Sequence, residues 1–254
     1  MMQKRQAVVL AAGKGTRMKS DLPKVLYPVF GKPIIDYVLD ALAEAGVERV
    51  ITVVGYRGEM VRDALSARRG VEFTEQTELL GTGHAVACCR EQLENSGEKV
   101  FIIAGDSPML DPETVRELFD LYESAEAGGN PISAVLGTVV KENPTGMGRI
   151  LRNGSGEFVG IVEEKDATDE ERKITEINMS YYIFNTRDLL DSLSELRADN
   201  AQKEYYITDV PTILLRKGKR VTAVPVLKPL ECLGVNTVED VRHIEEAIAA
   251  RRAV

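Results

Sequence analysis

Short apolar segments rich in valine and isoleucine alternate with amphipathic stretches along the first half of the chain. The apolar segments are residues 7–11, 50–54 and 100–104, a short strand is expected at residues 71–74, and the stretches with helical periodicity are residues 33–45, 60–68, 82–93 and 111–126. Because strands connected through helices pair in parallel, this order predicts a mainly parallel sheet with helices on both faces. We therefore expect an α/β fold of the Rossmann-like type.

The second half of the chain is less regular, so we expect a mixed sheet. Strand character is present in residues 132–140, 177–184 and 221–226, residues 149–152 and 158–162 flank a hairpin turn, and helical character is present in residues 187–196, 206–216 and 238–250. No Ser/Gly-rich linker, low-complexity tract or short repeat divides the 254 residues. We expect residues 1–254 to form a single domain, which is an ordinary length for an α/β fold.

Composition excludes several functional classes. A net charge of −8 argues against a general nucleic-acid-binding protein, which needs a basic surface. Two histidines are too few for a His-rich metal site, and adjacent Cys88 and Cys89 fit neither a disulfide framework nor a CxxC zinc site. No secretory signal and no apolar run of about 18 residues is visible, so we expect a cytoplasmic protein that binds no membrane.

A glycine-rich segment directly follows the first apolar run. Gly13 and Gly15 allow backbone N–H groups to approach a phosphate closely, while Arg17 and Lys24 supply positive charge. The segment is not a dinucleotide fingerprint, because Met18 stands where a third glycine is required. It is not a P-loop either, since no glycine precedes the Gly-Lys pair at the required spacing. It therefore predicts a phosphate site of another kind.

The glycine-rich segment resembles the signature of sugar-1-phosphate nucleotidyltransferases: leucine, two residues, Gly-x-Gly-Thr-Arg and then Pro-Lys. More narrowly, nearly all 254 residues resemble the uridylyltransferase domain of bacterial bifunctional enzymes that make UDP-N-acetylglucosamine. The strings that carry this resemblance are Leu80-Gly81-Thr82-Gly83-His84-Ala85, Gly105-Asp106, residues 144–150, residues 161–168, Glu176-Ile177-Asn178, residues 204–209 and Gly234-Val235-Asn236.

The resemblance implies a fold of the nucleotide-diphospho-sugar transferase type and a magnesium-dependent reaction. UMP would pass from UTP to N-acetylglucosamine 1-phosphate, with release of pyrophosphate. The nucleotide would bind in about residues 1–110 and the sugar in about residues 111–254. Two alternatives stay open: the same chemistry with another sugar 1-phosphate or with dTTP, and a non-catalytic regulatory protein that binds nucleotide sugars. Nothing in the sequence indicates the oligomeric state.

The resemblance also assigns roles to individual residues. Arg17 and Lys24 would be catalytic, and Asp106 and Asn236 would bind Mg²⁺. A carboxylate at the end of a buried apolar run suits this hard cation. The nucleotide would be bound by Leu10, Ala11, Ala12, Gly13, Gly15, Thr16, Gln76, Gly81 and Thr82. The sugar would be bound by Gly105, Gly148, Glu163, Asn178, Tyr206 and Thr208. His84 is assigned no role as a base, because a phosphate nucleophile needs none.

The sequence departs from the family pattern around the expected sugar site. Ala104 replaces an aromatic residue, Met147 replaces a tyrosine, and Met179-Ser180-Tyr181 stands where a Thr-Gly-Ile type string is usual. These changes concern the identity of the sugar more than the reaction. The 254 residues also contain no hexapeptide repeats of the acetyltransferase β-helix. We therefore do not expect them to carry the second activity of the bifunctional enzymes.

Overall fold

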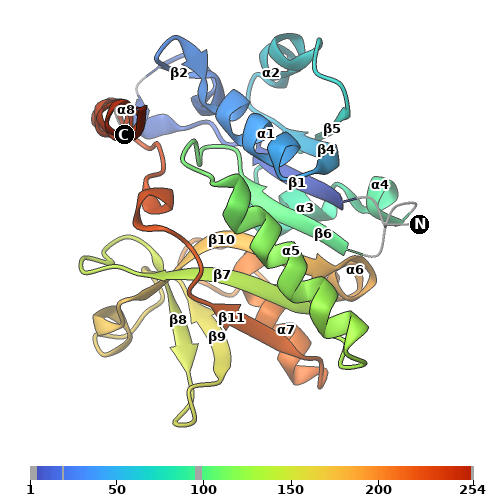
Figure 1. Ribbon diagram of the computed structural model, residues 1–254. Helices are drawn as coiled ribbons and strands as arrows, with labels where there is room; N and C mark the ends of the chain where they lie inside the picture. The colour runs from blue at the N-terminus through green and yellow to red at the C-terminus, as the bar shows by residue number, and fades with distance from the viewer. Residues whose placement is uncertain (1–4, 19, 95–98, 253–254) are drawn as a thin grey trace.

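The computed structural model describes residues 5–18, 20–94 and 99–252, and its centre is a mixed, mainly parallel sheet (Figure 1). The strand order is β11-β7-β10-β6-β1-β4-β5, in which β6, β1, β4 and β5 run parallel and β10 is antiparallel to β6 and β7. The strands are β1 (Arg5–Ala11), β4 (Val47–Val54), β5 (Val71–Glu75), β6 (Lys99–Ala104), β7 (Ala134–Val140), β10 (Glu176–Asn185) and β11 (Val221–Val224). A hairpin of β8 (Gly148–Arg152) and β9 (Phe158–Val162) extends from β10. The expected α/β fold is confirmed.

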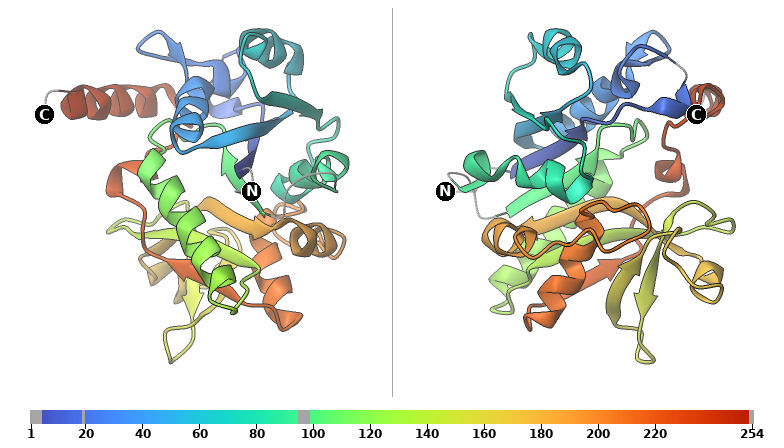
Figure 2. Two further views of the ribbon diagram at one scale, coloured as in Figure 1. Left: turned by 45° about the vertical axis from the view of Figure 1, so that its right-hand side comes forward. Right: turned by 180° about the vertical axis from the view of Figure 1, so that it is seen from behind.

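Helices cover both faces of the sheet (Figures 1 and 2). Helices α1 (Ile34–Glu44), α2 (Gly58–Leu65) and α5 (Pro112–Ala127) share one hydrophobic core with the sheet. Helices α3 (Thr82–Ala87), α4 (Arg90–Glu94), α6 (Thr186–Leu193) and α7 (Val210–Arg216) pack into the core on the other face. The strands alternate between the two: Val9 faces the first core and Val8 the second, as the period of two requires. Both faces are therefore apolar, which explains the continuous apolar runs in the sequence.

The prediction of a single helix over residues 82–93 is wrong. It is interrupted at Cys88 and Cys89, which join α3 to α4 through a turn. The amide of Cys89 donates to the carbonyl of Val86, three residues back, so the chain tightens and leaves the helical path. The helix expected over residues 206–216 likewise begins as the 3-10 helix η4 (Ile207–Asp209) before α7.

Several short elements were not expected from the sequence. They are the 3-10 helices η1 (Thr16–Met18), η2 (Lys24–Leu26), η3 (Glu171–Lys173) and η5 (Pro229–Cys232), and the two-residue strands β2 (Pro28–Val29) and β3 (Lys32–Pro33). Elements of two to four residues are too short to leave a hydrophobic period in the sequence. Two of them, η1 and η2, carry Arg17 and Lys24.

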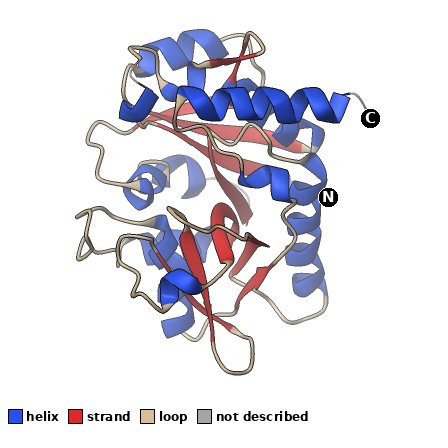
Figure 3. Ribbon diagram, turned by 90° about the vertical axis from the view of Figure 1, so that its left-hand side faces the viewer, coloured by secondary structure: helices blue, strands red, loops and turns tan. Residues whose placement is uncertain are grey.

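The C-terminal helix α8 (Val238–Arg252) lies apart from the two helical layers (Figure 3). Val241, Ile244 and Ile248 form a third, smaller hydrophobic cluster with Met18 and with residues of the segment after it. This packing ties the end of the chain to the glycine-rich loop. Over the described ranges, no helix combines the length and the apolar character needed to cross a bilayer.

A bulge interrupts β10 at Met179 and Ser180. Asn178 pairs with Thr138 of β7 and Tyr181 pairs with Gly137, so the two residues between them have no partner in the ladder. Ser180 adopts a positive φ of 59°. In the Thr-Gly-Ile type string expected here, this position is glycine, the residue that adopts such a conformation without strain.

Replacement of Lys203 by glycine should stabilise the protein. Lys203 is exposed and has a φ of 55°, a conformation that costs a residue with a side chain about 1–2 kcal/mol. Glycine loses about 0.5–1 kcal/mol more entropy on folding, so a net gain of about 0.5–1 kcal/mol is expected in the free energy of unfolding. Urea denaturation measures it. The control is Lys173→Gly in η3, which removes the same charge and should lower the free energy of unfolding. Equal effects of Lys203→Gly and Lys173→Gly on the free energy of unfolding would contradict the argument.

Candidate active site

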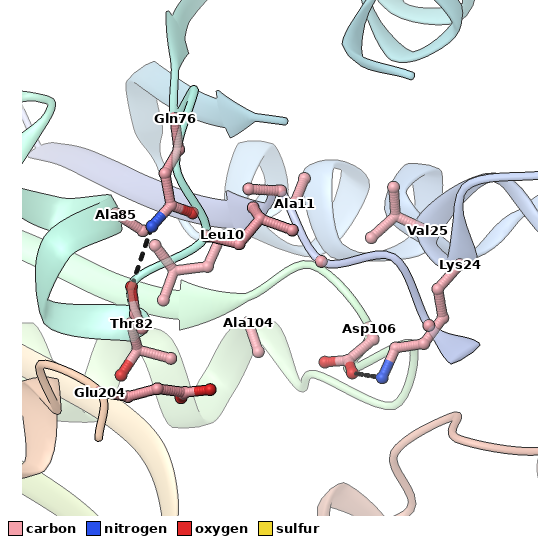
Figure 4. Close-up of a pocket in the computed structure, with 15 residues that line it drawn as sticks. Leu10, Ala11, Lys24, Val25, Gln76, Thr82, Ala85, Ala104, Asp106 and Glu204 are labelled. Atoms are coloured by element: carbon pink, nitrogen blue, oxygen red, sulfur yellow. Dashed lines mark hydrogen bonds and ion pairs between the residues drawn. The ribbon is translucent and has the colours of Figure 1, made fainter. Parts of the chain in front are cut away.

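A cavity of about 370 Å³ lies at the carboxyl ends of β1 and β6 (Figure 4). This is the edge of a parallel sheet where ligands bind in open α/β folds. Fifteen residues line it: Leu10, Ala11, Ala12, Gly13, Gly15, Lys24, Val25, Gln76, Leu79, Gly81, Thr82, Ala85, Ala104, Asp106 and Glu204. All the residues expected to bind the nucleotide, except Thr16, are among them.

Four charged or polar side chains meet at one end of this cavity. The Lys24 ammonium forms an ion pair with the Asp106 carboxylate and donates to the Asn236 side-chain oxygen at 3.1 Å. The Arg17 guanidinium donates to the same Asn236 oxygen at 2.7 Å. The structure therefore brings together the two residues expected to be catalytic and the two expected to bind the metal. We call these four residues the charged cluster.

Backbone hydrogen bonds hold Asn236 beside Asp106, although 130 residues separate them in the chain. The amide of Val235 donates to the carbonyl of Asp106 at 3.2 Å. On the other side, the Asp240 carboxylate accepts the amides of Asn236 at 2.8 Å and Thr237 at 2.7 Å, at the start of α8. The position of Asn236 thus depends on α8 and on the strand β6 together.

The donor set of the charged cluster fits a magnesium ion that is also bound by substrate. Asp106 and Asn236 offer hard oxygen ligands, and both contact the Lys24 ammonium, so their oxygens surround one point of positive charge. No cluster of three or more His, Cys, Asp or Glu side chains arranged for a metal occurs among the described residues. Two protein ligands are compatible with Mg²⁺, which usually keeps waters and binds phosphate oxygens in protein sites.

Gly15 shapes the loop around Lys24. Its φ is 63°, and a Cβ at this position would lie 2.6 Å from Cβ of Lys24. The absence of a side chain therefore lets the Lys24 stem lie against the loop backbone. Two requirements, a positive φ and close contact, account for this glycine.

Gln76 lies at the opposite end of the cavity from Lys24 and Asp106 (Figure 4). It is 4% exposed, and its backbone amide donates to the carbonyl of Val54 at 2.8 Å, which continues the edge of the sheet. Its side-chain nitrogen lies 3.0 Å from the carbonyl of Gly81 and 3.0 Å from Nδ1 of His84. The side chain is therefore fixed from two directions.

The segment that includes Glu204 and Tyr205 is attached to the loop before α3. Tyr205 donates its amide to the carbonyl of Leu80 at 2.8 Å and accepts the amide of Gly83 at 2.7 Å. The Thr82 hydroxyl accepts the amide of Ile207 at 3.1 Å. These contacts place the Glu204 side chain in the cavity beside Thr82 (Figure 4), a position that the sequence did not indicate because it depends on pairing between distant segments.

Gly81→Ala should strongly destabilise this junction. Gly81 has φ 110° and ψ 175°, a region that only glycine adopts readily, and an added Cβ would lie 2.6 Å from the carbonyl oxygen of Tyr205. Strain and overlap together should lower the free energy of unfolding by about 2–4 kcal/mol. Urea denaturation tests this, with Gly154→Ala as the control, since a Cβ there meets nothing within 4 Å. A loss below about 0.5 kcal/mol would contradict the steric argument.

Half of the residues expected to bind the sugar line a second cavity. Glu163, Tyr206 and Thr208 border a space of about 320 Å³. The remaining residues that line it are Ile161, Val162, Asp166, Arg197, Asp199, Asn200 and Asp209. Residues 204–209 thus connect the two cavities: Glu204 faces the first, and Tyr206, Thr208 and Asp209 face the second.

Burial raises the pKa of the Glu163 carboxyl, while a hydrogen bond from Thr208 opposes the shift. Burial also raises the pKa of Asp209, and the nearby carboxylate of Asp166 adds to the shift. Carboxylates in such surroundings favour hydrogen-bond donors, which a sugar supplies through its hydroxyl groups and an acetamido N–H.

Gly148 lies next to Glu163, and Asn178 lies opposite Gly148, but neither residue lines either cavity. They pair with each other across β8 and β10, and a Cβ at Gly148 would lie 3.5 Å from both Glu163 carboxylate oxygens. Asn178 is 8% exposed and donates to the Tyr182 hydroxyl at 2.6 Å. The amide of Gly105 donates to the carbonyl of Leu10 at 2.9 Å, so Gly105 continues the pairing of β6 with β1, and it does not line the second cavity.

Residues 7–208 match the family described as MobA-like NTP transferase domain. "Bifunctional protein GlmU" of Carboxydothermus hydrogenoformans is 43% identical over 248 residues, which cover 98% of this chain and 54% of that protein. The protein of the same name from Clostridium perfringens is 43% identical over 245 residues, covering 96% and 52%. The chain therefore spans about half the length of the curated relatives it matches.

A solved structure has the same fold. The crystal structure of UDP-glucose pyrophosphorylase complexed with UDP-glucose superposes with a TM-score of 0.77 and covers 98% of this chain and 99% of that chain. At 22% sequence identity, this likeness concerns the fold. It confirms the expectation of a nucleotide-diphospho-sugar transferase type of sheet with helices on both faces.

Proposed function

This chain belongs to the MobA-like NTP transferase domain family and is a nucleotidyltransferase, and from that premise we propose its substrates. We propose that it transfers UMP from UTP to N-acetylglucosamine 1-phosphate and releases pyrophosphate, with Mg²⁺ as cofactor. In this proposal residues 1–254 act as one catalytic domain. About residues 1–110 bind the nucleotide and about residues 111–254 bind the sugar.

One observation carries the proposal: Lys24 and Asp106 of the charged cluster lie at one end of a cavity and Gln76 lies at the opposite end. A nucleoside triphosphate needs cations for its phosphates at one end and a hydrogen-bonding amide for its base at the other. The second cavity, lined by Glu163, Tyr206 and Thr208, supports a sugar site next to it. The names of the relatives add support for the amino-sugar branch of the family.

In the proposed reaction, a phosphate oxygen of the sugar 1-phosphate attacks the α-phosphorus of UTP in line, and pyrophosphate leaves. This oxygen is already anionic, so no side chain has to remove a proton. Arg17 neutralises the leaving pyrophosphate, and Lys24 neutralises the phosphates around the α-position. Asp106 and Asn236 would hold Mg²⁺, which when bound would add further neutralisation of phosphate charge.

Pyrophosphate release tests the proposal. The protein is incubated with UTP, dTTP or CTP and with N-acetylglucosamine 1-phosphate, glucosamine 1-phosphate or glucose 1-phosphate, with Mg²⁺ or with EDTA. The largest kcat/KM is expected for UTP with N-acetylglucosamine 1-phosphate, and only with Mg²⁺. A clear preference for another sugar or for dTTP would overturn the substrate assignment. Tight binding of UDP-N-acetylglucosamine without any release of pyrophosphate would instead indicate a regulatory protein.

A further inference from the structure

We propose that His84 is a positioning residue that fixes the orientation of the Gln76 side-chain amide and thereby makes the site select uracil over cytosine. This inference rests on the proposed uridylyl transfer and deepens it. No role as a base is expected for His84, whereas the structure places its ring against the side-chain amide of Gln76.

The orientation of the Gln76 amide follows from its neighbours. The carbonyl of Gly81 accepts from the Gln76 side chain at 3.0 Å, and because a carbonyl is only an acceptor, the NH₂ group must point towards it. The second contact of the same nitrogen is Nδ1 of His84, also at 3.0 Å. Both N–H bonds of the amide are thus engaged within the protein.

His84 reinforces this orientation in one tautomer. Nδ1 accepts the Gln76 N–H only when the ring proton is on Nε2, so the contact defines which nitrogen is protonated. His84 lies in the first turn of α3, three residues after Gly81, where the helix holds its side chain on the same side as the Gly81 carbonyl. The helix therefore supplies both acceptors that hold the amide.

In this arrangement the side-chain oxygen of Gln76 is the group that can accept a hydrogen bond from the pyrimidine base of the nucleotide. No described residue donates a hydrogen bond to that oxygen, and Gln76 lines the nucleotide cavity. An acceptor fits N3 of uracil, which carries a proton. It opposes N3 of cytosine, which is itself an acceptor, so two lone pairs would face each other. Recognition of cytosine would require the amide to turn over, against Gly81 and His84.

The contribution of His84 can be separated from that of Gly81. Without His84, one of the two hydrogen bonds of the Gln76 NH₂ group is lost, and the amide turns over more easily. Loss of one such hydrogen bond corresponds to a change of about tenfold in the preference for UTP over CTP. The chemistry itself takes place at the other end of the cavity, so kcat with saturating UTP should change little.

The experiment compares kcat/KM for UTP and for CTP in the intact protein and in four variants. His84→Ala should lower the UTP/CTP ratio about tenfold, mainly through KM for UTP. His84→Asn puts an amide oxygen near the place of Nδ1 and should restore most of the ratio, whereas His84→Gln puts it near the place of Nε2 and should not. His243→Ala, at the other histidine of the chain and on the exposed side of α8, should leave the ratio unchanged.

The outcomes separate this inference from the proposed function. If the unaltered protein turns over no UTP, the proposed function fails. The positioning role is overturned if the protein prefers UTP and His84→Ala has the same UTP/CTP ratio of kcat/KM. It is also overturned if His84→Asn and His84→Gln have equal ratios. The Asn and Gln variants keep the test decisive should His84→Ala fold poorly.

Discussion

Lys24→Met should lower kcat by about 10²-fold or more, with little loss of stability. Methionine keeps much of the aliphatic stem that lies against Gly15 but removes the ammonium that contacts Asp106 and Asn236. The positive charge is needed most when negative charge on the phosphates reorganises in the transition state, so the effect should be on kcat. Steady-state pyrophosphate release at saturating UTP and sugar 1-phosphate measures it.

Lys32→Met is the matched control for this prediction. Lys32 forms an ion pair with Asp40 on the surface and does not line the first cavity, so its loss should leave kcat within about twofold. Arg17→Ala should resemble Lys24→Met, because both cations meet at Asn236. Near-normal turnover of Lys24→Met or Arg17→Ala with saturating UTP would show that the charged cluster does not bind the reacting phosphates.

Asp106→Asn should lower kcat by about 10²-fold or more and should raise the Mg²⁺ concentration needed for half-maximal rate. An amide has nearly the same shape as the carboxylate but carries no charge, and so it is a much weaker ligand for a hard cation. The same change removes the anionic partner of Lys24. A titration of rate against Mg²⁺, with UTP held constant, measures both effects.

Asp21→Asn is the control for the metal assignment. Asp21 lies in the same loop between Arg17 and Lys24, but its side chain is 91% exposed and forms an ion pair with Arg57 at 3.7 Å. Its replacement should leave the Mg²⁺ titration unchanged. Equal shifts for Asp21→Asn and Asp106→Asn would indicate a general electrostatic effect and would remove Asp106 from the metal site.

The sequence predicted most of the regular elements, because their patterns are local. The side chains of β1 alternate between two cores, and α5 begins with Asp111 accepting the amide of Glu113 at 2.9 Å, followed by Pro112. Both features depend on residues within a few positions of each other. The break at Cys88 and the short helices that carry Arg17 and Lys24 were missed, since neither leaves a periodic pattern.

The amino-acid sequence was sufficient to predict the class of the fold and, through the glycine-rich segment and its resemblance, the chemistry expected at that segment. Which distant residues share a site became visible in the folded chain. Asn236 reaches Asp106 through a hydrogen bond between segments 130 residues apart, and Glu204 reaches the first cavity through the pairing of Tyr205 with Leu80. Even the neighbouring residues Gln76 and His84 meet only because a turn at Gly81 folds the helix back. Such contacts arise from the path of the whole chain, which no local pattern of residues records.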